Sequence, residues 1–313
     1  MHPPIPTADL LYFGRGSWDP RECEAQEDAF FRSLRLPNGT HKTTCRCRLT
    51  DLNELVQGLL PLHRPLEIMD VAISSGVSTV EWLDSLERAG ITCHLVAGDA
   101  VMDACLISLG GWLKALVDRA GRLLQLDVAG HAVRLPPPRR RDRVRYFPLL
   151  RLMSRIARAN APMVHSCCGS GLAERGRFLT FRPLKLLSPG LAGTGRIEAI
   201  EDDILRDRHF LHRFDVLRAA NILNYCYFNA ETLGKMLANL RERLRPSGLL
   251  IVCRTMPEGT NHGSVFRLGE QGRFSLVAEL NDGSEITELV LGLAPTEVTS
   301  SEPEPAPLSA AVA

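Results

Sequence analysis

Three small residues and an acid in the first third of the chain could hold a nucleotide-like ligand. Residues 66–71 form an apolar run that carries Asp70 near its end. The turn that follows contains Ala72, Ser74 and Gly76. Small side chains let the backbone approach a ligand, and a helix start offers unpaired N–H groups with a partial positive charge. The pattern predicts a strand, a ligand-binding turn and a helix. An ordinary strand-to-helix connection is the alternative, because a glycine-rich fingerprint would have glycine at residues 72 and 74.

A second acid stands where the hydroxyls of a ribose would need an acceptor. Residues 92–99 form another apolar run, and it ends in Asp99. Asp99 follows Gly76 at close to the spacing of roughly 20 residues at which a carboxylate meets ribose hydroxyls in dinucleotide-type folds. This spacing favours a ligand-binding turn over an ordinary connection.

Three later segments complete an ordered set of motifs, over residues 197–204, 213–225 and 244–254. The set resembles the motifs of class I S-adenosylmethionine-dependent methyltransferases. It is similar in part to the chemotaxis receptor glutamate methyltransferases, whose first motif also has small residues around Ser-Ser/Thr-Gly. The departures are Val77, where an acid usually follows the motif glycine, and Ala220, where an arginine usually precedes Asn221. The resemblance covers about a third of the chain.

The resemblance implies S-adenosylmethionine as the cofactor and gives each motif residue a role. The residues that would line or orient its methionine part are Asp70, Ala72, Ser74 and Gly76. Asp99 would accept hydrogen bonds from the ribose. Asp203 would meet the adenine amino group with Ile204 packed nearby, or the adjacent Asp202 would take this role.

The resemblance also implies a place for the reacting methyl group. Asn221 would face it with Tyr225 close by, although a turn or helix-cap role for Asn221 stays open. His262, expected in a loop after the fifth strand, is the candidate general base, and His165 is the second candidate. An ordinary surface histidine is the alternative for each.

Alternating strand and helix patterns must position these residues. They predict an α/β fold, with a Rossmann-like seven-stranded sheet that ends in an antiparallel hairpin over residues 274–291. We assign residues 1–64 to an N-terminal helical lid or extension and residues 65–293 to the methyltransferase domain. Residues 294–313 are expected to be a disordered tail.

An insertion is expected at about residues 105–192, because a crossover between strands needs only a helix and two short loops. It reads as a small β-meander over residues 115–135 and an amphipathic helix over residues 146–160. Nine arginines and one aspartate lie between His131 and Asn160. The helix could contact an anionic membrane surface or form the roof of the substrate pocket, and we favour the roof.

Composition excludes several other classes of protein. With 313 residues, 45% hydrophobic and 23% charged residues, the chain has the composition of a soluble globular protein, and its net charge of +1 argues against bulk nucleic-acid binding. No run reaches the ~18 apolar residues of a membrane span. We therefore expect a cytoplasmic protein with reduced cysteines. The His/Cys clusters at residues 41–47 and 165–168 lack Cys-x-x-Cys spacing, so we predict no metal.

These observations favour a methyltransferase that acts on a small or lipid-like molecule by direct displacement. Two alternatives stay open. One is a protein carboxylate methyltransferase of the chemotaxis type, and the other is a non-catalytic cofactor-binding protein.

Overall fold

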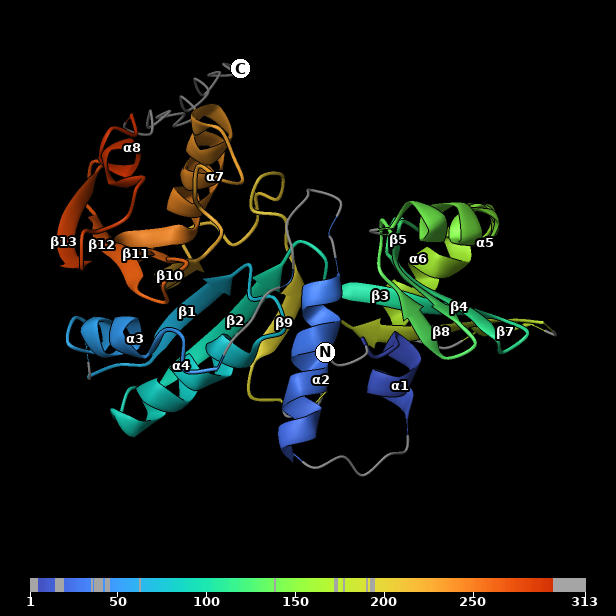
Figure 1. Cartoon of the computed structure of the whole chain (residues 1–313). Coiled ribbons are helices and arrows are strands. Elements are labelled where there is room, and N and C mark those ends of the chain that lie inside the picture. Colours follow the sequence, from blue (N-terminus) through green and yellow to red (C-terminus); the bar gives the residue numbers. More distant parts are fainter. Residues whose placement is uncertain are drawn as a thin grey trace, which may run out of the picture.

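The computed structural model contains two sheets (Figure 1). It describes residues 5–14, 20–34, 36, 42, 46–61, 63–137, 139–171, 174–176, 178–189, 191 and 195–294. The predicted tail lies almost entirely outside these residues, as do His41 and Cys45 of the first His/Cys cluster. No helix in the described ranges is both long and apolar enough to cross a membrane.

The larger sheet has seven strands in the order β13-β12-β11-β10-β1-β2-β9. The strands are β1 (Leu66–Val71), β2 (Cys93–Asp99), β9 (Glu198–Glu201), β10 (Phe214–Ala220), β11 (Leu244–Thr255), β12 (Asn261–Leu268) and β13 (Phe274–Leu280). Across the sheet, the five neighbouring strands β9, β2, β1, β10 and β11 run parallel. Strands β12 and β13 are antiparallel to their neighbours. The predicted α/β class with a mostly parallel seven-stranded sheet is confirmed.

Alternating side chains of this sheet build two cores, because successive residues of a strand point to opposite faces. Ile68 of β1 packs on the face covered by α3 (Thr50–Gln57) and α4 (Val77–Arg88). Its neighbour Met69 points to the other face, beneath α7 (Ala230–Arg243) and α8 (Thr287–Leu291). The strands are buried on both faces, which explains their apolar composition.

The end of the sheet differs from the prediction. Residues 285–291, predicted as a strand, form a turn followed by helix α8, and the antiparallel hairpin consists of β12 and β13. Ile286 and Val290, one helical turn apart, are both buried against α7, which a strand would not allow. The predicted loop at His262 is also wrong, because this residue lies in β12 opposite Arg254 of β11.

Between β2 and β9 the chain forms a second sheet of six strands, in the order β6-β5-β4-β3-β8-β7. The strands are β3 (Asp103–Leu109), β4 (Leu113–Asp118), β5 (Leu123–Val128), β6 (His131–Val133), β7 (Glu174–Arg175) and β8 (Leu179–Lys185). The predicted meander corresponds to β4, β5 and β6. Strands β3 and β8, which join it to the larger sheet, were not predicted.

Helices cover both faces of the inserted sheet (Figure 1). One face packs on α5 (Arg140–Ala159) and α6 (Ala161–Ser170), with Met153 and Ala157 of α5 fully buried. The other packs on α1 (Ala8–Phe13) and α2 (Pro20–Ser33). The basic helix α5 begins at Arg140, earlier than the predicted start at residue 146. The buried part of its apolar face covers the inserted sheet.

Candidate functional site

The turn between β1 and α4 has a left-handed backbone at alternate positions. The φ angles are 58° at Ala72, 60° at Ser74 and 81° at Gly76. A left-handed conformation costs a residue other than glycine about 1–2 kcal/mol. The amide of Ser74 donates to Asp99 Oδ2 at 2.8 Å and that of Ile73 to the Gly98 carbonyl at 3.2 Å, so β2 holds the turn in place. Backbone strain of this kind gathers at ligand sites.

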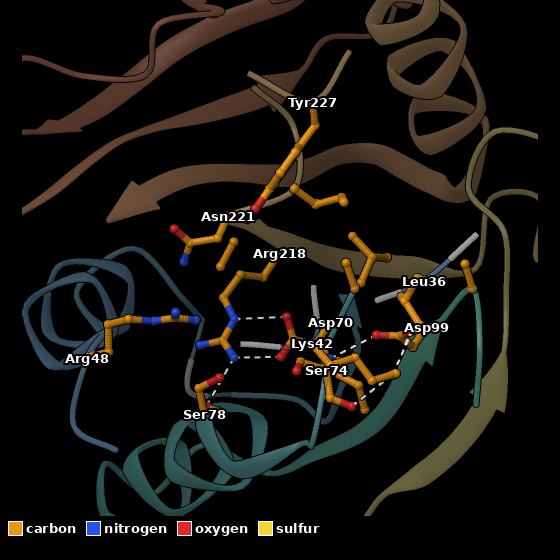
Figure 2. Close-up of a pocket in the computed structure, with 16 residues that line it drawn as sticks. Leu36, Lys42, Arg48, Asp70, Ser74, Ser78, Asp99, Arg218, Asn221 and Tyr227 are labelled. Atoms are coloured by element: carbon orange, nitrogen blue, oxygen red, sulfur yellow. Dashed lines mark hydrogen bonds and ion pairs between the residues drawn. The ribbon is translucent and has the colours of Figure 1, made fainter. Parts of the chain in front are cut away.

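A cavity opens at the carboxyl ends of β1, β2 and β10 (Figure 2). Its volume is about 700 Å³, including the part open to solvent. Five of the residues that the sequence pointed to line it: Asp70, Ala72, Ser74, Asp99 and Asn221. Strand order reverses between β1 and β10, and ligands of open α/β sheets bind in the crevice at such a point.

Lys42 reaches into this cavity from the N-terminal part of the chain and contacts Asp99. Its Nζ lies 2.8 Å from Asp99 Oδ1 and donates to the Ser74 carbonyl at 3.2 Å. Both side chains are buried. Asp99 also accepts from the backbone amide of Val101 at 3.2 Å. The carboxylate predicted to bind ribose hydroxyls is therefore occupied by an ammonium group of the same chain.

Asp70 forms a second buried ion pair, with Arg218 of β10. The guanidinium donates from Nε to Oδ1 at 3.0 Å and from Nη2 to Oδ2 at 2.5 Å. It also donates to Asn53 and to the Ser78 carbonyl, while Thr79 donates its hydroxyl to Asp70 at 2.8 Å. This network ties together β1, β10, α3 and α4, as Figure 2 shows in part. Arg218 was not predicted as a site residue. The sequence signal that could have identified it is a charged residue within the mostly apolar strand β10.

Asn221 joins the ends of two strands. It follows β10 with a φ of 62°, and its Oδ1 accepts from the Thr255 amide of β11 at 2.7 Å. The backbone amide of Asn221 donates to the Cys253 carbonyl at 2.7 Å. These bonds hold its side chain in the wall of the cavity. Tyr225 is half exposed and does not line the cavity, whereas Tyr227 does.

The remaining candidate residues for cofactor binding do not line this cavity. Gly76 faces Leu187, and Ile204 is buried in the core beneath α7. Asp203 accepts from the amide of Leu205 in a turn after β9. Asp202 is held by Arg243 through two bonds of 2.7 and 3.0 Å.

Neither candidate base lies at the cavity. His262 Nδ1 lies 3.6 Å from an Asp282 carboxylate oxygen. His165 lines a separate hollow between the two sheets, near Arg119 and Glu201. Burial raises the pKa of the Glu201 carboxyl in that hollow.

Cys167 and Cys168 of the second His/Cys cluster are buried in the core of the inserted sheet. Cys105 and Cys167 are buried together in the inserted core, with their sulfurs 3.4 Å apart. Burial raises the pKa of Cys168 to about 12, which favours the thiol over the thiolate that binds metals. In the described part of the chain, Asp202, Asp207 and His209 lie close enough to share an ion, but Asp202 is already paired with Arg243.

No protein-family model matches the sequence, and no curated protein is similar to it. Among solved structures, the methyltransferase domain of the citrinin polyketide synthase is 14% identical, with a TM-score of 0.33 over 78% of this chain and 41% of that one. An O-methyltransferase family protein from Burkholderia thailandensis is 15% identical, with a TM-score of 0.32 over 79% and 46%.

A third similar structure is the 1,6-didemethyltoxoflavin-N1-methyltransferase of Burkholderia thailandensis, with bound S-adenosylhomocysteine. It is 13% identical, with a TM-score of 0.33 over 78% of this chain and 65% of that one. The chain spans less than half the length of the first two structures and just under two thirds of the third.

Proposed function

We propose that this protein is an S-adenosylmethionine-dependent methyltransferase that acts on a small or lipid-like molecule by direct displacement. The observation that carries the proposal is the cavity at the point where strand order reverses, bounded by the left-handed turn, Asp99 and Asn221. This arrangement suits a ligand with a ribose at one end and a polar chain along the turn.

The residues present fit such a cofactor. Asp99 would accept from the ribose hydroxyls once Lys42 moves aside, and the turn at Ala72 and Ser74 would follow the methionine part. When bound, the cofactor supplies a methyl group on a positively charged sulfur. Asn221 would stand beside that methyl group, because its side chain is fixed at the other end of the cavity.

The chain's contribution to the chemistry is alignment. The leaving group departs as a neutral thioether, so the residues need only hold the acceptor and the methyl group in line and exclude water. The short ion pair between Asp70 and Arg218 keeps the wall of the cavity formed by β1 and β10 in a fixed position. A preorganised wall limits the ordering that binding would otherwise require.

Titration calorimetry with S-adenosylmethionine and S-adenosylhomocysteine tests the proposal. We expect saturable binding to the full-length protein at one site, lost or weakened in Asp99→Ala. The matched control is Asp103→Ala, an acid of β3 that pairs with Lys185 outside the cavity. Failure of the folded wild-type protein to bind either compound would refute the proposal.

A non-catalytic cofactor-binding protein is the second candidate, because Ala72 and Ser74 stand where a glycine-rich fingerprint would have glycine. Transfer of a labelled methyl group to any acceptor would exclude it. The chemotaxis-type protein carboxylate methyltransferase, a cytoplasmic location and the roof role of the basic insert stay predictions.

A further inference from the structure

A second cavity adjoins the first beyond Asn221. It has a volume of about 670 Å³, including the part open to solvent. Arg48, Asn221 and Tyr227 line both cavities, so the two meet at these side chains. Arg254 and Thr255 at the end of β11 form the far wall. An acceptor bound here would lie next to a methyl group held beside Asn221.

Two guanidinium groups face this second cavity. Figure 2 shows Arg48, from the region before α3, extending to the side of the first cavity where Arg218 and Asn221 lie. Arg254 donates from Nη1 to both carboxylate oxygens of Glu285, at 2.9 and 3.0 Å, and from Nη2 to the Cys226 sulfur at 3.0 Å. These contacts hold the guanidinium in place, and in the described part of the chain they leave its Nε–H without an acceptor. The charged side chains in the described lining of this cavity are the two arginines, which suits an anionic ligand.

Within the described residues, neither cavity is lined by a histidine or by a carboxylate outside an ion pair that could act as a general base. The acids in these linings are Asp70 and Asp99. Each acid lies in a buried ion pair, with Arg218 and Lys42 respectively. An alcohol or a protonated amine would have to lose a proton to react, whereas a carboxylate is already ionised at neutral pH.

From these observations we infer that the acceptor is a small carboxylic acid, bound as the carboxylate by Arg48 and Arg254 and methylated on oxygen. The inference rests on the proposed function. A carboxylate oxygen attacks the methyl carbon, the C–O bond forms as the C–S bond breaks, and the electron pair of that bond stays on sulfur. No proton moves. The methyl ester is neutral and is held less tightly by the two arginines, which favours its release.

The test uses the full-length protein, S-adenosylmethionine with a labelled methyl group, and matched pairs of acceptors. The pairs are benzoate with benzyl alcohol and octanoate with octanol, and a glutamate-containing peptide distinguishes a protein carboxylate from a free acid. We expect at least about tenfold more label in the free acids than in the alcohols, in a product that alkali hydrolyses. Equal or greater labelling of the alcohols would overturn the inference, and labelling of the peptide alone would overturn the assignment to a small acid.

Arg254→Gln gives a second readout. We expect this variant to raise the KM for the carboxylate at least about tenfold while the cofactor Kd measured by calorimetry stays unchanged, because Arg254 lines only the second cavity. The matched control is Arg206→Gln. Arg206 is highly exposed and lines neither cavity, so this variant should change neither value. An unchanged KM in Arg254→Gln would overturn the inference.

Alkylation of Cys226 measures acceptor binding without turnover. The thiol is exposed, lines the second cavity and contacts Arg254. We expect benzoate or octanoate to slow its alkylation in the presence of S-adenosylhomocysteine, and benzyl alcohol to leave it unchanged. If calorimetry shows cofactor binding but no carboxylate protects Cys226, the inference fails and the proposed function stands. If calorimetry shows no cofactor binding, the proposed function itself fails.

Discussion

The buried ion pair between Asp70 and Arg218 gives the sharpest prediction about stability. Both side chains are almost fully buried, at 3% and 1% exposure. Asp70→Asn keeps the shape of the side chain but removes its charge, so the guanidinium stays buried without a counter-ion. Loss of one partner of a buried pair costs about 3–5 kcal/mol. Arg218 also lies 4.1 Å above the Trp82 ring and would keep that contact.

This cost is a large share of the ~5–15 kcal/mol by which a native domain is stable. With a denaturant dependence of about 1–3 kcal/mol per molar urea, it lowers the unfolding midpoint by at least about 1 M. Urea unfolding followed by circular dichroism measures the shift. The matched control is Asp215→Asn. Asp215 lies in β10, the strand that carries Arg218, but its partners Arg64 and Arg245 have exposed side chains. Pairs with exposed partners contribute about 0–1 kcal/mol, so we expect a much smaller shift.

A double variant separates charge from packing. If the unpaired guanidinium causes the loss, Asp70→Asn combined with Arg218→Met should lose less than the sum of the two single variants, by about 1–3 kcal/mol. Strictly additive losses, or a loss in Asp70→Asn no larger than in Asp215→Asn, would refute this reasoning.

Three further predictions concern the cavity and the hollow beside it. Asp99→Ala should lower cofactor affinity at least about tenfold, because lost charge-assisted hydrogen bonds cost about 1.5–3 kcal/mol; unchanged calorimetric affinity in the folded variant would remove Asp99 from the site. Lys42→Met should raise the cofactor affinity, because the ammonium competes for Asp99, and weaker binding would show that Lys42 instead orients the carboxylate. Burial raises the pKa of the Glu201 carboxyl in the folded protein above its value in the unfolded chain. The contribution of this carboxyl to folding stability is therefore fully present below the unfolded-state pKa and is lost as pH rises through the folded-state pKa. Glu201→Gln should therefore match the wild type in urea midpoint near pH 4 and exceed it at pH 7; equal midpoints at both values would contradict the shift.

Local sequence patterns determined the main sheet. The apolar runs predicted over residues 66–71 and 92–99 correspond to β1 and β2, because a strand buried on both faces needs consecutive apolar residues. The same patterns placed small residues in the turn and an acid at or near the end of each run. Side-chain periodicity also indicated the meander and the basic helix, since these signals depend only on residues near in sequence.

Only the tertiary structure decided which charges meet and which elements close the fold. Asp70 and Arg218 are 148 positions apart, and no local pattern indicates that one lies against the other. Lys42 lies within the His/Cys cluster at residues 41–47, but no local pattern indicated its contact with Asp99, so it was missed for the same reason. Residues 285–291 carry apolar positions compatible with a strand or a helix, and burial of Ile286 and Val290 against α7 decided for the helix. Ion pairs and element ends follow from packing between distant segments, which spacing along the chain does not record.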